Sequence, residues 1–116
     1  MNVDIKINKD RGNGMNKSGK KRYITRKINE EVDEELQSII WKMHEMLENN
    51  RKDKMDYFQI FKIFKMGDNL IIKNRQENPI MNDKLMLKRN YSGLEQITIL
   101  IIDNQVSQTM LSLSDY

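Results

Sequence analysis

Residues 33–50 read DEELQSIIWKMHEMLENN, and this stretch predicts the main helix of the chain. Asp33 is a favourable N-cap residue, and the two glutamates after it lie in the first turn, where the helix dipole favours acidic side chains. Apolar side chains then recur at helical spacing and form one stripe. The stripe consists of Leu36, Ile39, Ile40, Met43 and Leu47. We expect Asn49-Asn50 to end the helix.

The segments around this helix predict strands. The expected strands span residues 23–27, 56–65, 70–73, 84–89 and 97–102. Strand 56–65 is apolar on both faces, which is typical of a central strand. A turn at 66–69 and a loop at 76–83 separate these strands, and residues 109–113 fit either a strand or a helical turn. The fold class is therefore α+β, with one main amphipathic helix packed on a mostly antiparallel sheet of four to six strands.

The length of the chain fits one domain, because 116 residues is a common size for a single core. The chain has no cysteine, which excludes disulfides and thiolate metal sites. Its longest apolar run, residues 99–102, is far shorter than the roughly 20 residues that span a bilayer. We therefore expect a cytoplasmic protein.

The net charge of +3 is distributed unevenly along the sequence. Residues 1–29 carry nine basic and two acidic residues, whereas residues 30–116 carry eleven basic and fifteen acidic residues. We expect residues 1–20 to be a flexible basic arm and residues 21–116 to be a single α+β domain. Met15 offers a second start, so we hypothesise that residues 1–14 are an untranslated leader or a dispensable extension.

A basic arm can be a solvated leader, or it can contact phosphates. The basic residues that would contact phosphates are Lys17, Lys20, Lys21, Arg22, Arg26 and Lys27.

The sequence predicts no enzyme and no cofactor, because it combines one histidine and no cysteine with dispersed glycines that form no phosphate-binding loop.

Trp41 lies about 140° from the centre of the apolar stripe, on the side of the helix expected to face solvent. An exposed tryptophan can anchor a protein interface. The alternative is that a loop, the chain start or the C-terminal segment folds over it. His44 lies on the flank of the stripe, and we interpret it as a boundary residue. The candidate partner-binding residues are Glu30, Glu31, Glu34, Glu35, Trp41, His44 and Glu48.

Aromatic and basic residues alternate at the expected central strand. They are Tyr57, Phe58, Phe61, Lys62, Phe64 and Lys65. Such a face could stack bases while lysines follow phosphates. The glycine-containing RNA-recognition signature is missing, so core packing is the expected role of these aromatic residues.

Five blocks of sequence carry a resemblance to a known family. They are KRYITR (21–26), VDEEL (32–36) running into Trp41, DYFQIF (56–61), NRQENP (74–79), and IID (101–103) followed by TML (109–111) and the terminal Asp115-Tyr116. In this order they resemble small proteins of staphylococci and related low-GC Gram-positive bacteria, catalogued as domain of unknown function 960. Such proteins are often carried on mobile elements and phages. The resemblance supplies no catalytic residues and implies an accessory function.

These observations favour a small non-enzymatic binding protein that acts by contact with a protein partner. A host-defence or DNA-processing nuclease, inhibited in the manner of an anti-CRISPR protein or a nucleic-acid mimic, is the natural candidate. The alternative is an accessory protein that binds nucleic acid through the basic arm.

Overall fold

Seven β-strands and two α-helices make up residues 6–8, 19–89 and 96–116, which this computed structural model describes. The strands are β1 Lys6–Asn8, β2 Lys21–Thr25, β3 Phe58–Met66, β4 Asn69–Glu77, β5 Ile80–Lys88, β6 Gln96–Asp103 and β7 Ser107–Ser112. The helices are α1 Arg26–Glu31 and α2 Glu34–Arg51, and two short 3-10 turns follow as η1 Lys52–Lys54 and η2 Leu113–Asp115.

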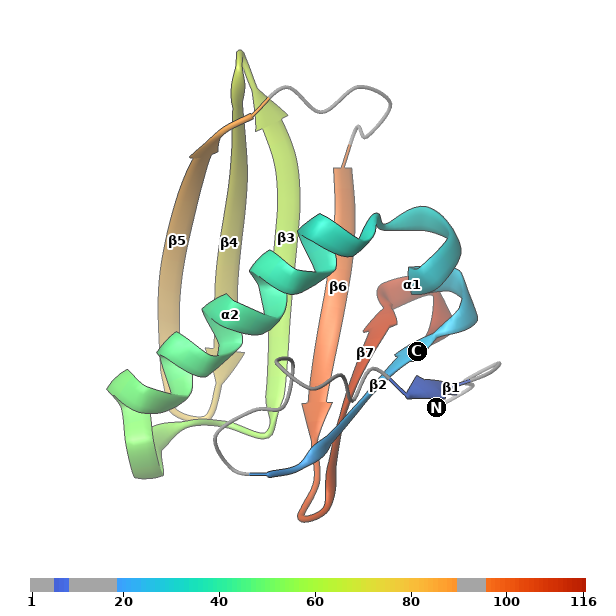
Figure 1. Cartoon of the computed structure of the whole chain (residues 1–116). Helices are drawn as coiled ribbons and strands as arrows, with labels where there is room; N and C mark the ends of the chain where they lie inside the picture. Colours follow the sequence, from blue (N-terminus) through green and yellow to red (C-terminus); the bar gives the residue numbers. More distant parts are fainter. Residues whose placement is uncertain (1–5, 9–18, 90–95) are drawn as a thin grey trace.

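The strands form one sheet in the order β1-β2-β7-β6-β3-β4-β5, and α2 lies across one face of it (Figure 1). Neighbouring strands pair antiparallel except β2 and β7, which pair parallel. The predicted α+β class, the main helix and the mostly antiparallel sheet are therefore confirmed. Strands β2 to β7 reach the upper end of the predicted number, and β1 adds one more.

Helix α2 begins as the sequence predicts. The side chain of Asp33 accepts a hydrogen bond of 2.8 Å from the backbone N–H of Leu36. The apolar stripe of α2 then packs on side chains that the central strands direct toward the helix, including Phe61, Ile63 and Ile99. This packing forms the hydrophobic core, and it places the opposite side chains of the same strands on the other face of the sheet.

Several boundaries differ from the prediction for local reasons. The first predicted strand ends at Thr25, because its hydroxyl caps α1 by accepting a hydrogen bond of 3.3 Å from the N–H of Ile28. The predicted loop at 76–83 is instead a tight turn at Asn78-Pro79, so β5 is nine residues long. Residues 107–112 form a strand. Of the two structures that the sequence allowed for the C-terminal segment, a strand or a helical turn, the strand is the one observed.

The predicted basic arm, residues 1–20, falls mostly outside the described residues. Within it, Lys6–Asn8 form strand β1, which pairs antiparallel with β2. The expectations for Lys17 and for a leader at residues 1–14 largely concern residues outside the described ranges.

Candidate functional site

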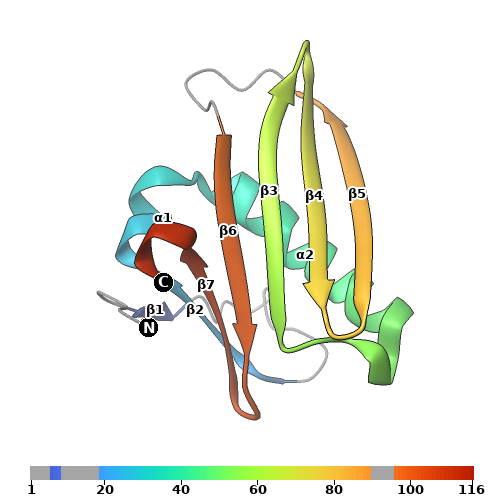
Figure 2. The ribbon, with the colours of Figure 1, turned by 180° about the vertical axis from the view of Figure 1, so that it is seen from behind.

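The two faces of the sheet differ in what covers them. Helix α2 packs on one face, whereas Figure 2 shows that no described helix lies over β3, β4 and β5 on the other. We call this second side the open face. On the described strands β2 to β5, this face carries six basic side chains and one acidic one. They are Lys21, Lys62, Lys73, Arg75, Lys84, Lys88 and Glu77. The helical segment 26–51, on the opposite side, carries seven acidic and four basic residues.

Three lysines stand directly opposite one another at the centre of the open face. The register pairs Lys62 with Lys73 and Lys73 with Lys84, so this lysine row crosses β3, β4 and β5. Neighbouring strands lie about 4.8 Å apart, and like charges placed directly opposite destabilise a sheet. Neither Lys62 nor Lys84 forms an ion pair with a described residue. The sheet itself therefore leaves this positive charge uncompensated.

An apolar row lies beside the lysine row. Phe64 pairs with Ile71, and Ile71 with Met86, across the same three strands. Ile71 is buried, Phe64 is half-buried, and Met86 is 52% exposed. The ammonium of Lys73 lies 5.6 Å from the ring centroid of Phe64, within the range of a cation–π contact. The open face thus combines a line of positive charge with accessible apolar surface at Phe64 and Met86, on either side of the buried Ile71.

The predicted partner-binding residues do not form one surface. Glu30, Glu31, Glu34 and Glu35 are exposed at the junction of α1 and α2, where Glu35 lies 3.3 Å from a guanidinium nitrogen of Arg89. The acidic junction, as we call Glu30, Glu31, Glu34 and Glu35, is separated from the remaining predicted residues along α2. At 1.5 Å per residue, Glu48 lies roughly 21 Å further along the helix than Glu34.

Of the two alternatives for Trp41, an exposed interface anchor or packing within the protein, the structure has the second, since the side chain is only 5% exposed. The guanidinium carbon of Arg22 lies 4.9 Å from the Trp41 ring centroid, and Arg22 also pairs with Glu45. The chain start, as strand β2, therefore covers the tryptophan, which was the alternative explanation. His44 is also fully buried, at 0% exposure. Neither Trp41 nor His44 can anchor a partner on the surface described here.

The predicted phosphate-binding residues are also dispersed. Arg22 is buried against Trp41, and the ammonium of Lys20 lies 2.6 Å from a carboxylate oxygen of Asp103. Lys21 is exposed on the open face, while Arg26 and Lys27 belong to the first turn of α1. The described members of this predicted set therefore do not lie on one surface, and Lys17 lies outside the described residues.

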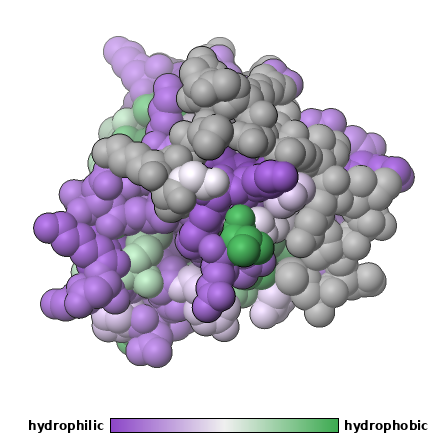
Figure 3. Space-filling model, turned by 60° about the horizontal axis from the view of Figure 1, so that its bottom comes forward, coloured by the Kyte–Doolittle hydropathy of each residue, from purple (hydrophilic) through white to green (hydrophobic). Residues whose placement is uncertain are grey.

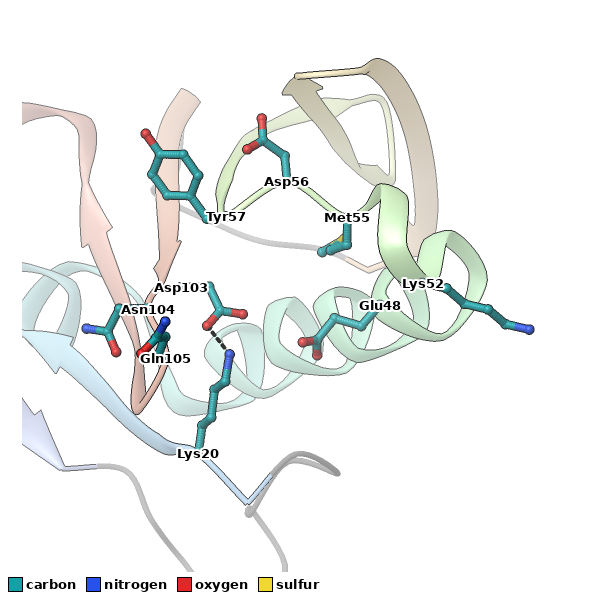
Figure 4. Close-up of a pocket in the computed structure, with 9 residues that line it drawn as sticks. All are labelled: Lys20, Glu48, Lys52, Met55, Asp56, Tyr57, Asp103, Asn104 and Gln105. Carbon is teal, nitrogen blue, oxygen red and sulfur yellow. Dashed lines mark hydrogen bonds and ion pairs between the residues drawn. The ribbon is translucent and has the colours of Figure 1, made fainter.

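A pocket of about 460 Å³ opens where α2 ends beside the β6–β7 turn (Figure 4). Among the described residues seen from this end, most are hydrophilic, with a hydrophobic patch between them (Figure 3). Inside the pocket, Glu48 lies 3.5 Å from Nδ1 of His44 and accepts a hydrogen bond of 3.3 Å from the amide of Gln108. The same amide donates to Asp103 over 3.1 Å, and Asp103 holds Lys20.

These contacts explain the electrostatics of the pocket. Burial would raise the pKa of Glu48, but the net shift is downward from the ordinary value of 4.5. The neighbouring His44 ring, together with Lys20 and Gln108, favours the carboxylate. Because these carboxylates are bound by groups of the protein itself, we interpret the pocket as a structural polar network. Within the described ranges no group of three or more metal-ligating side chains converges.

A family model described as a staphylococcal protein of unknown function (DUF960) matches residues 21–115. The chain belongs to this family. A crystal structure of a protein of unknown function from Enterococcus faecalis is similar, with a TM-score of 0.67 and 18% identity over 82% of this chain and 89% of that one. At this identity the likeness shows a shared fold alone. No curated protein matches the chain. Among the described helices, none is long and apolar enough to cross a membrane.

The structure of this family member also contains a buried arginine that the sequence analysis missed. Arg51, the last residue of α2, is 5% exposed and donates to the side-chain oxygens of three amides and one carboxylate. The acceptors are Gln59 at 3.3 Å, Gln76 at 2.8 Å, Asn74 at 2.8 Å and Asp83 at 2.8 Å. Polar residues at inward positions of apolar strands were the signal that could have revealed it. This network fixes the end of α2 against β3, β4 and β5.

Proposed function

We propose that this protein is a non-enzymatic binding protein whose open face contacts the phosphate backbone of nucleic acid. The observation that carries the proposal is the lysine row, Lys62, Lys73 and Lys84, on an uncovered sheet face. Phosphate contacts by lysine supply sequence-independent affinity, because they release condensed counterions. An anionic backbone lying across β3, β4 and β5 would also relieve the repulsion between the three ammonium groups.

This proposal retains nucleic-acid binding, the alternative function from the sequence, but assigns it to the open face of the sheet in place of the basic arm. The described part of the predicted arm offers few available cations, since Arg22 and Lys20 are engaged within the domain. On the open face, four side chains are exposed beside one another, namely the lysine row and Arg75. A bound nucleic acid would place the protein in the cytoplasm.

The salt dependence of binding tests the proposal quantitatively. Three or four phosphate contacts predict that log K falls with log salt with a slope of about −2 to −4. Replacing Lys73 by glutamine should weaken binding of any sequence and reduce the magnitude of that slope by about 1. The measurement is fluorescence anisotropy with labelled single-stranded and duplex oligonucleotides over a range of salt concentrations.

The matched control for this experiment is Lys42→Gln. Lys42 is also exposed, but it lies on α2, on the opposite side of the sheet. We expect Lys42→Gln to bind like the wild type. Equal effects of the two substitutions, or no binding of either oligonucleotide at low salt, would refute the proposal.

A protein partner is the second candidate, favoured by the four exposed carboxylates of the acidic junction. Such a cluster can mimic nucleic acid and steer the protein toward a basic cleft. A nuclease of host defence or DNA processing is the partner class we propose for it, with a role on a mobile element.

Co-purification tests this second candidate. The tagged protein is expressed in a low-GC host, and its partners are compared with and without nuclease treatment. A stoichiometric protein that survives nuclease and is lost in Glu30→Lys/Glu31→Lys supports it. A partner retained by the charge-reversed protein would exclude the acidic junction as its site.

A further inference from the structure

We infer that the nucleic acid on the open face is single-stranded, with its phosphates along the lysine row and its bases on the apolar row. This inference rests on the proposed function and specifies its ligand. It also fixes an orientation, because the strand must cross β3, β4 and β5 roughly at right angles.

The distance between the lysine row and the apolar row suits a single strand. Phe64 and Lys62 are two residues apart on β3, and so are the corresponding members on β4 and β5. Side chains two positions apart on a strand are separated by about 6.6 Å. A single strand presents its bases to one side of its backbone, so a backbone on the lysine row holds its bases over the apolar row.

The contact between Lys73 and Phe64 also favours a single strand. The ammonium lies 5.6 Å from the ring centroid, so one charge and one aromatic face form a pair on the sheet surface. Sequence-tolerant binding of single strands combines these two elements, a positive track for phosphates and aromatic rings on which bases stack. Met86, 52% exposed two strands away, extends the apolar row across β5.

A duplex would use only half of this surface. Its bases are paired and stacked inside the double helix, so the phosphates could reach the lysine row while the apolar row met no base. An anionic lipid surface would match the charge as well, but membrane binding needs apolar side chains that reach about 5–10 Å into the headgroup region. Phe64 is half-buried and Ile71 is fully buried, which favours a flat base over a membrane.

A direct test compares three probes at low salt: a labelled oligothymidine, the duplex that it forms with its complement, and vesicles containing anionic lipid. We expect the single strand to bind at least tenfold more tightly than the duplex. Phe64→Leu retains an apolar side chain but removes the ring. It should weaken single-strand binding by about tenfold, the loss expected for one stacked base, and leave duplex binding unchanged.

Tyr116→Ala is the matched aromatic control. Tyr116 is 57% exposed and packs on Phe58, which shares the open face but lies four residues from Lys62 along β3 and belongs to neither row. Its loss should not change single-strand binding, and thermal melting confirms that both variants fold. Equal affinity for the duplex, or an unchanged affinity of Phe64→Leu, would overturn the inference and leave the proposed function standing. No binding to either nucleic acid, or binding to vesicles alone, would overturn both.

Discussion

Replacing Arg51 by alanine should destabilise the protein strongly, because this buried arginine joins the end of α2 to the sheet. The guanidinium is 5% exposed and donates hydrogen bonds to oxygens from β3, β4 and β5. Its removal leaves buried amide oxygens of Gln76 and Asn74 without this donor. The end of α2 would then lose its polar attachment to the sheet.

The magnitude follows from the individual contacts. Hydrogen bonds to a charged group contribute about 1.5–3 kcal/mol each. The two 2.8 Å bonds to Gln76 and Asn74 therefore account for about 3–6 kcal/mol, which overlaps the range of about 3–5 kcal/mol typical of breaking a buried charged pair. The carboxylate of Asp83 is 50% exposed, so its contribution is at most about 1 kcal/mol. Against a total stability of about 5–15 kcal/mol, this loss is large.

Urea unfolding followed by circular dichroism measures this difference. The matched control is Arg75→Ala, because Arg75 is 46% exposed and pairs with Glu77 only at the surface. We expect Arg75→Ala to cost less than about 1 kcal/mol. Arg51→Lys, which keeps the charge but not the planar fork of donors, should fall between the two. A loss for Arg51→Ala within about 1 kcal/mol of the control would refute the reasoning.

Three further predictions concern α2 and its end. Trp41→Ala should destabilise by about 3–5 kcal/mol in the same urea assay; a loss under about 1 kcal/mol would contradict the burial of the ring. Lys52 adopts a φ of 53°, so Lys52→Gly should stabilise by about 1 kcal/mol, checked by thermal melting, and a lower melting temperature would contradict the strain. The pKa of Glu48 is lowered in the folded protein. As the pH falls, the Glu48 carboxylate is therefore protonated in the unfolded chain before it is protonated in the folded one. The stability advantage of wild type over Glu48→Gln should therefore be present above pH 4.5 and shrink as the pH falls below it; a pH-independent difference would contradict this.

The main helix could be predicted because its signals are local. A cap at Asp33 and a stripe of helical period act within a few residues, and tertiary packing agrees with them. The full length of β5 could not be predicted, because Asn82 and Asp83 interrupt its apolar residues after the proline, and only pairing with β4 defines where the strand begins. The lone proline also suggested a loop, whereas Pro79 sits in a tight turn that allows pairing to continue.

The burial of Trp41 could not be predicted from the helix alone. The helical stripe identifies the face that packs on the sheet, but α2 is covered a second time by Arg22 of β2. That contact joins residues far apart in sequence and has no periodic signal.

The basic face of the sheet could not be predicted from the charge distribution along the chain, for a related reason. Summing charges along the chain indicated a basic arm, whereas alternation along the strands places basic side chains on one face. The lysine row needs the register of three strands, and a one-residue slip would send Lys73 to the helix side.

The most direct test of the central claim is to map a single-stranded oligonucleotide on the isotopically labelled protein by NMR. We predict chemical-shift changes concentrated at Lys62, Phe64, Lys73 and Lys84, with little change along α2. Shifts confined to the acidic junction, or no shifts at a large excess of oligonucleotide and low salt, would contradict the account.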